Sequence, residues 1–286
     1  MKRVIPWWAK IFLKIVWSRL PIRYRLWKQL GVFRHGFMER PDYVSTVFMT
    51  HWTRAAFSRK AGEFYVLELG CGDSLASCLM GNSVGAAGYY MVDTGNFAAK
   101  DVETYKRIAS ALSARGQPVP DISACSSVGE ILTRVRGQYL IDGLQSLRTL
   151  PDRHIDLVWS QAVLEHIGRG EFVETLRELR RVIRDDGVMS HRVDLKDHLG
   201  GALNNLRFTT ETWESPLMAK SGFYTNRIRY KEMLDLMRAA GFSVEVVQED
   251  RWECLPTPRE RLSAPFRNLP DDDLLISGFD VVLTPR

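Results

Sequence analysis

Short apolar runs alternate with polar, helix-like segments through residues 64–195. The apolar runs are rich in β-branched and aromatic residues and read EFYVLELG, YYMVD, QYLID, HIDLVWS and GVMSHRVDL. Between them, residues 74–80, 100–114 and 171–184 have the spacing of helices, most clearly in EFVETLRELRRVIR. This regular alternation predicts βαβ units and a parallel sheet covered by helices on both faces.

The flanking segments complete the predicted architecture. A helix is expected over residues 41–61, where apolar residues share one face, and another over YKEMLDLMRAAGF. SVEVVQEDRW and LLISGFDVVL are expected to close the sheet. The predicted fold class is α/β: a Rossmann-like, mostly parallel seven-stranded sheet with a closing antiparallel strand. We expect an N-terminal helical extension or lid at 1–60 and a main domain at 61–286, with an insertion at 196–230 that lacks periodicity.

Charge is concentrated at the N-terminus. Residues 1–40 hold ten Lys or Arg and a single acid, Glu39, whereas the whole chain has a formal charge of only +5. The body is therefore mildly acidic. An enzyme acting on nucleic acid would normally line its working groove with positive charge, so no nucleic-acid partner is expected.

The basic N-terminal segment has two interpretations. Trp8, Ile11, Phe12 and Ile15 share a helical face, while two lysines interrupt the apolar run and argue against a signal peptide or a membrane span. The favoured interpretation is a helix packed on the main domain as core or lid. The alternative is peripheral contact of residues 1–30 with an anionic membrane. The four cysteines are scattered and form no paired motif, so neither disulfides nor a zinc site is expected. The predicted location is the cytoplasm, with peripheral contact at the inner membrane face as the alternative.

The loop after the first predicted strand contains two glycines among carboxylates. It reads ELGCGDSL over residues 68–75, so Leu75 stands where a dinucleotide fingerprint has its third glycine. Glu68 and Asp73 would repel a pyrophosphate and attract a ligand that carries an ammonium group. The loop therefore favours a cationic ligand.

Asp93 ends the second predicted strand, 21 residues after Gly72. An acid at this place accepts hydrogen bonds from ribose hydroxyls, in dinucleotide and other nucleoside sites alike. The alternative is a turn residue that opens Asp-Thr-Gly-Asn. Its coupling to the glycine loop favours the ribose role.

At this point the sequence resembles the class I S-adenosylmethionine-dependent methyltransferases. Four motifs, in order, carry the resemblance: VLELGCG, YLIDG, DLVWSQAVLEH and ELRRVIRDDG. Ser74 stands where many members have a third glycine. The third motif is similar to that of small-molecule members, and the Asn/Asp-Pro-Pro-Tyr/Phe motif of nucleic-acid amino-methyltransferases is absent.

The resemblance implies S-adenosyl-L-methionine as cofactor and assigns roles to particular residues. It places the loop residues Gly70, Cys71 and Gly72 against the methionine part of the cofactor, with Glu68 holding the amino group. It further implies that Asp142 meets the adenine amino group and that Ser160 and Gln161 face the sulfur end of the cofactor.

An alcohol acceptor would have a proton to lose, for which histidine is suited near neutral pH. His166, His191 and His198 lie near expected strand ends, and His191 or His198 is preferred over His166 as the general base. Packing or capping remains the alternative for His166. HRVDLKDH also holds two Asp and two His, but their spacing matches no metal motif, and no metal is expected.

The insertion has a composition suited to sugar recognition, because amides bind hydroxyls and aromatic faces stack on rings. The residues in question are Asn204, Asn205, Arg207, Trp213, Tyr224, Asn226 and Arg227. FRHG, HRVDLKDH and SGFYTNRI also resemble methyltransferases associated with bacterial surface-polysaccharide biosynthesis.

The function expected from the sequence is methyl transfer from S-adenosyl-L-methionine, O-directed, to a sugar, a glycolipid or another small-molecule acceptor. Two alternatives remain open. One is a nicotinamide-dependent oxidoreductase on a Rossmann fold, and the other is a non-catalytic scaffold that binds the cofactor.

Overall fold

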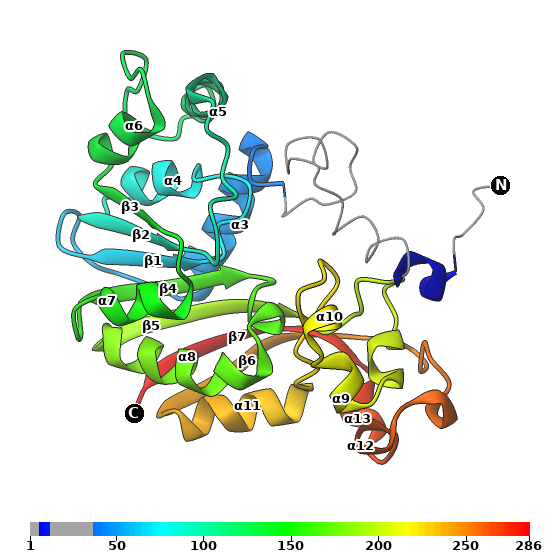
Figure 1. The fold of residues 1–286 in the computed structure, drawn as a ribbon. Helices are drawn as coiled ribbons and strands as arrows, with labels where there is room; N and C mark the ends of the chain where they lie inside the picture. The colour runs from blue at the N-terminus through cyan, green and yellow to red at the C-terminus, as the bar shows by residue number, and fades with distance from the viewer. Residues whose placement is uncertain (1–5, 12–36) are drawn as a thin grey trace.

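A single seven-stranded sheet organises the protein. The computed structural model describes residues 6–11 and 37–286. The strands lie in the order β3-β2-β1-β4-β5-β7-β6 (Figure 1). They are β1 (Tyr65–Leu69), β2 (Gly88–Val92), β3 (Gly137–Leu140), β4 (Ile155–Gln161), β5 (Ile183–Asp194), β6 (Phe242–Arg251) and β7 (Ile276–Pro285).

Strands β1 to β5 pair in parallel, and β7 is antiparallel to both of its neighbours, β5 and β6. The predicted fold class is thus confirmed. The chain order reverses between β1 and β4, because β2 and β3 follow on one side of β1 and β4 and β5 on the other. In open sheets of this kind, ligands bind beyond the carboxyl ends of the strands at such a switch point.

Helices cover both faces of the sheet (Figure 1). One layer contains α3 (Pro41–Arg54), α4 (Ser77–Ser83), α5 (Val102–Ser113) and α6 (Val128–Arg134). The opposite layer contains α7 (Leu144–Thr149), α8 (Arg169–Val182) and α11 (Tyr230–Ala239). The two layers enclose separate buried clusters of apolar side chains, one on each face.

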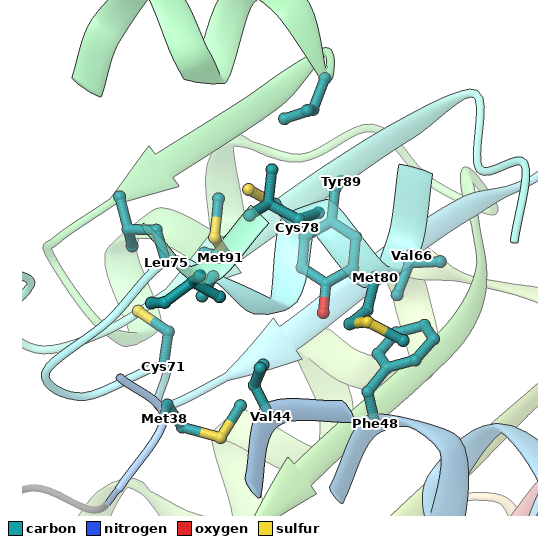
Figure 2. Packing of buried hydrophobic residues seen from close by; sticks show 14 of the residues in the cluster. Met38, Val44, Phe48, Val66, Cys71, Leu75, Cys78, Met80, Tyr89 and Met91 are labelled. Atoms are coloured by element: carbon teal, nitrogen blue, oxygen red, sulfur yellow. The ribbon is translucent and has the colours of Figure 1, made fainter. Parts of the chain in front are cut away.

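Helix α3 belongs to the first layer and is shorter than predicted, since it ends at Arg54. Val44 and Phe48 point from it into the same cluster as Tyr89 of β2 (Figure 2). Met38, just before the helix, lies beside Cys71 of the glycine loop in that cluster. The segment that precedes the main domain therefore covers the glycine loop directly.

The insertion lacks strands, as its sequence indicated, and contains short helices. They are η2 (Asn204–Arg207), α9 (Thr210–Trp213) and α10 (Pro216–Ala219). Three more short helices, η3 (Arg259–Arg261), α12 (Ala264–Arg267) and α13 (Asp271–Leu274), lie between β6 and β7. Leu203 and Leu206 of the insertion share a small buried cluster with Leu262, Phe266 and Leu274 of that second segment.

The described part of the N-terminal segment rests on the insertion. Residues 7–11 are helical, and the Trp7 ring meets Phe208 edge-on at 6.1 Å, with the Arg207 guanidinium 4.9 Å from the Trp7 ring centre. Trp8, predicted on the packed face, is 62% exposed. Phe12, Ile15 and most of the basic residues lie outside the described residues. Among the described helices, none is long and apolar enough to cross a membrane.

Candidate cofactor and acceptor site

The glycine loop after β1 requires glycine at two positions. Gly70 and Gly72 have φ angles of +69° and +62°, in the left-handed region that side chains disfavour. A Cβ atom on Gly70 would lie 2.5 Å from Cγ2 of Val163, which follows β4. The loops after β1 and β4 therefore meet at Gly70, at the carboxyl edge of the sheet.

Asp93 ties three loops together at this edge. Its Oδ2 accepts a hydrogen bond from the Gly72 amide over 2.9 Å, and its Oδ1 accepts one from the Thr94 amide over 2.7 Å. Its carbonyl oxygen accepts a bond from the amide of Gly143, after β3, over 2.8 Å. The Asp93 side chain remains half-buried. Exposed Asp142, which the third predicted strand included, lies on this last loop because β3 ends at Leu140.

Glu68 lies beneath the glycine loop and is fully buried. Its Oε2 accepts hydrogen bonds from the Ser77 hydroxyl and, over 3.1 Å, from the Tyr89 hydroxyl. Tyr89 in turn accepts a bond from Trp159 Nε1 over 2.9 Å. Burial raises the pKa of Glu68 to about 8. Its contact with a cofactor amino group remains a prediction.

The electrostatic character of the loop is acidic. Burial, followed by the charges of Glu68 and Asp93, raises the pKa of the Cys71 thiol well above its usual value. Asp73, also in the loop, is buried. Two left-handed glycines and a half-buried acid at the end of β2 fit the amino acid end and the ribose of S-adenosyl-L-methionine. A pyrophosphate would be repelled by the carboxylate of Asp93 at this edge, whereas Glu68, with a pKa of about 8, is mostly neutral near pH 7 and adds little to that repulsion.

Ser160 and Gln161 end β4 on opposite faces of the sheet, and each meets a histidine. Ser160 Oγ lies 2.7 Å from His191 Nδ1, whereas Gln161 Oε1 lies 3.0 Å from His51 Nε2. His191 is completely buried, and burial lowers its pKa to about 3. An imidazole without solvent access and with so low a pKa is a poor general base, so the preference for His191 is revised.

His166 and His198 come together on the exposed side of the site. Their ring centres are 4.7 Å apart, although they follow different strands, β4 and β5. His166 Nδ1 lies 2.9 Å from the carbonyl oxygen of Tyr224. Because a carbonyl only accepts, Nδ1 must carry the proton and Nε2 the lone pair in the neutral ring. In this tautomer Nδ1 donates to the Tyr224 carbonyl, and Nε2 on the other side of the ring is the basic nitrogen.

The acidic residues of HRVDLKDH organise the loop after β5. Asp197 is buried and accepts hydrogen bonds from the amides of Leu199, Gly200, Gly201 and Asn204 and from the Asn204 side chain. Asp194 Oδ1 accepts a bond from the Lys196 amide over 3.0 Å. Within the described residues, no three His, Cys, Asp or Glu side chains are grouped as metal ligands.

The polar residues of the insertion are internal, which corrects the interpretation that they face a sugar. Trp213 is fully buried and donates from Nε1 to the Thr225 carbonyl over 2.7 Å. Asn226 donates to the carbonyls of Leu164 and Ile167. Arg227 lies 5.5 Å from the Trp213 ring centre and donates to the main chain. These groups shape the insertion, because buried polar atoms need partners; of the seven, Arg207 remains half-buried.

Two buried groups at the site carried no recognisable sequence signal. His51 stands on the apolar face of α3, where a histidine reads as core. Glu165 of LEH is buried, which raises its pKa to about 8, and its Oε1 accepts a bond from the Asp194 amide over 3.2 Å. Glu165 lines a cavity with Asn205 and Arg229 that has room for about one water molecule.

Comparison with known proteins agrees with this geometry. Residues 67–190, less than half of the chain, match a family model described as a methyltransferase domain. No match was found among curated proteins.

Solved structures similar to this chain include the YcgJ protein from Bacillus subtilis, with 15% identity over 86% of this chain and 99% of that one, at a TM-score of 0.44. A second is an S-adenosylmethionine-dependent methyltransferase from Mesorhizobium loti, with 15% identity, 82% and 97% coverage and a TM-score of 0.43. A third is phosphoethanolamine N-methyltransferase 2 from Haemonchus contortus in complex with S-adenosyl-L-methionine, with 11% identity, 89% and 54% coverage and a TM-score of 0.47.

The glycine loop and Asp93 both lie within residues 67–190, the stretch that matches the methyltransferase domain. The protein is an S-adenosyl-L-methionine-dependent methyltransferase. The enzyme class and the cofactor predicted from the sequence are confirmed.

Proposed function

We propose that the enzyme methylates a hydroxyl group of a small-molecule acceptor. The resemblance of FRHG, HRVDLKDH and SGFYTNRI to methyltransferases of surface-polysaccharide biosynthesis extends the proposal to a sugar or a glycolipid as acceptor. The observation that supports O-methylation is the exposed pair His166–His198. His166 stands three residues after Val163, whose side chain packs on Gly70. His166 thus belongs to the same loop after β4 as Val163, and this supports its assignment as the base.

Different residues of the site would bind the cofactor and remove the acceptor proton. When bound, S-adenosyl-L-methionine supplies a methyl group on a positively charged sulfur. Asp93 would accept hydrogen bonds from the ribose, and the acidic loop would hold the amino acid end. As the acceptor oxygen forms its bond to the methyl carbon and the bond from that carbon to sulfur breaks, His166 Nε2 would take the hydroxyl proton. The gain comes from alignment and from removal of that proton.

The cofactor claim is tested by isothermal titration with S-adenosylhomocysteine and, separately, with NADH. We expect binding of the first only, because the carboxylates of the loop repel a pyrophosphate. Tritiated methyl transfer into fractionated envelope and cytosolic extracts then tests the acceptor. Label in glycan supports the proposal, whereas label in protein or nucleic acid contradicts the acceptor class. A chain that binds S-adenosylhomocysteine but labels nothing would be a scaffold.

His166→Gln should lower the rate of labelled methyl transfer by about 10²- to 10⁴-fold, the usual contribution of a general base. The affinity for S-adenosylhomocysteine should remain unchanged, because only the acceptor proton loses its base. His154→Gln is the matched control: His154 precedes β4 at the opposite edge of the sheet and bonds to Tyr90. Equal activity of His166→Gln and the wild type would exclude His166 as the base.

We further propose that residues 1–30 hold the enzyme at an anionic membrane surface near a lipid-linked acceptor. The basic charge of the segment and exposed Trp8 support this. Deletion of residues 1–30 should reduce co-sedimentation with phosphatidylglycerol vesicles several-fold at low salt, and added salt should weaken wild-type binding in the same way. Unchanged partition of the truncated chain would leave the segment as a lid alone.

A further inference from the structure

The end of β4 contains a hydrogen-bonded chain of three side chains from three separate elements. His51 of α3 lies with Nδ1 2.8 Å from Ser190 Oγ of β5 and with Nε2 3.0 Å from Gln161 Oε1 of β4. Only 1% of His51 is exposed. Contact between these residues is not predictable from the sequence, because 110 positions separate His51 from Gln161.

The chemistry of the partners defines the tautomer of the ring. An amide oxygen only accepts, so His51 Nε2 must carry a proton and donate it to Gln161 Oε1. Nδ1 is then the acceptor and takes the bond from the Ser190 hydroxyl. Burial lowers the pKa of His51 to about 4, so near neutral pH the ring is neutral and carries a single proton.

The consequence concerns the other end of the Gln161 side chain. With its oxygen held by His51, the amide must turn its NH₂ group the opposite way. Among the described residues no hydrogen bond takes up that nitrogen, and the side chain is only half-buried. The next residue, Ala162, has a φ of +54°, a strained conformation for a non-glycine residue. The strained turn and the held amide lie together at the switch-point edge of the sheet.

Helix α3, which carries His51, makes two further contacts with the sheet. Arg54, one turn along α3, forms an ion pair with buried Asp280 of β7 at 2.8 Å, and the His51 ring lies 5.1 Å from the Trp159 ring. Both contacts anchor the helix to the sheet. The position of the imidazole is therefore set by the fold and not by a loop.

We propose that His51 is a positioning residue that orients Gln161 so that its amide NH₂ donates a hydrogen bond to a ligand oxygen in the methyl-transfer site. The inference rests on the proposed function, since it assumes that this edge of the sheet binds cofactor and acceptor. The ligand oxygen belongs either to the cofactor or to the acceptor, and both present the same chemistry to the amide.

Two conservative variants separate this role from simple packing. In His51→Gln, the new amide nitrogen stands as many bonds from the main chain as Nε2 of histidine and can still donate to Gln161. In His51→Asn, the amide reaches only the Nδ1 position and so meets Ser190 alone. If His51 serves only for packing, the His51→Asn and His51→Gln variants should differ in thermal stability, which melting curves measure, and should not differ in cofactor affinity or methyl transfer.

S-Adenosylhomocysteine affinity and labelled methyl transfer are then measured for both variants. We expect His51→Asn to lose about tenfold in one of the two readouts, as for one lost hydrogen bond, while His51→Gln stays within about threefold of wild type. A loss of S-adenosylhomocysteine affinity assigns the oxygen to the cofactor, and a loss of transfer at unchanged affinity assigns it to the acceptor. Equal behaviour of the variants in both readouts overturns the proposal.

The tautomer provides a test that does not depend on activity. Long-range ¹H–¹⁵N correlation spectra of ¹⁵N-histidine-labelled protein, assigned with His51→Gln, should show the proton on Nε2 of His51. A proton on Nδ1 would reverse the orientation of the amide and refute the inference. If wild type fails to bind S-adenosylhomocysteine, the proposed function fails, while this spectrum still decides the hydrogen bond.

Discussion

Gly70→Ala should lower the free energy of unfolding by about 2–5 kcal/mol and abolish S-adenosylhomocysteine binding. Two costs add up at this position. A left-handed φ of +69° costs an alanine about 1–2 kcal/mol. The new Cβ would also lie 2.5 Å from one Val163 methyl and 2.8 Å from the other, and overpacking of this kind costs about 1–3 kcal/mol. Relief of the clash must displace either the glycine loop or the loop after β4, and we propose that both loops contribute to the cofactor site.

Matched variants isolate the two costs, with urea unfolding as the measurement. Gly116→Ala has a similar φ of +79° but nothing within 4 Å of the new Cβ, so it should show the backbone cost alone. Val163→Ala removes the colliding methyls, and the double variant Gly70→Ala/Val163→Ala should regain most of the steric part through a favourable coupling energy. If Gly70→Ala costs no more than Gly116→Ala, the close contact between the loops is not present.

The sequence predicted the sheet well because strand periodicity and burial are local properties. Each parallel strand is a short apolar run, as expected for a strand that is buried on both faces, and helices such as α8 have a clear apolar face. The glycine loop and Asp93 were also predictable, since a left-handed turn and a strand-end acid depend on residues near one another in sequence. Their meeting in space follows from the parallel order of β1 and β2.

The acceptor side was less predictable because it depends on contacts between distant segments. Period-two alternation predicts that His191 points to one face of β5, but not that α8 and α11 seal that face. Likewise, the polar residues of the insertion read as ligand-binding side chains until their carbonyl partners are known. Asn226, for example, bonds to Leu164, 62 residues away. A buried polar group and an exposed one have the same sequence signature.

His51 illustrates the same limit from the other side. On the face of α3 that also carries Val44, Val47 and Phe48, a histidine reads as a core residue. Its burial was therefore foreseeable, whereas its partners on β4 and β5 were not. Only the pairing of β4 with β5 brings Gln161 and Ser190 to either side of the ring.

Glu68→Gln should make the protein more stable at pH 8 and weaken its affinity for S-adenosylhomocysteine. The pKa of Glu68 is about 8 in the folded chain and near 4.5 when exposed. Between these values the unfolded chain releases a proton that the folded chain retains. Stability is therefore full below pH 4.5 and falls as the pH rises toward 8, by up to about 1.4 kcal/mol per pH unit for one group. A neutral glutamine keeps the Ser77 and Tyr89 partners and removes this loss.

The slope is best measured between pH 6.5 and 8. Below pH 6.5, His51 and His191 contribute with the opposite sign: burial lowers their pKa values to about 4 and 3, so their contribution is lost as the pH falls. Above it, the buried acids Glu68 and Glu165 contribute most among the described residues, and both destabilise with rising pH. Urea unfolding of Glu68→Gln should show a slope shallower by about one proton, while exposed Glu63→Gln should match wild type. An unchanged slope would show that Glu68 takes up no proton on folding in this pH range, which contradicts both its raised pKa and the predicted gain in stability.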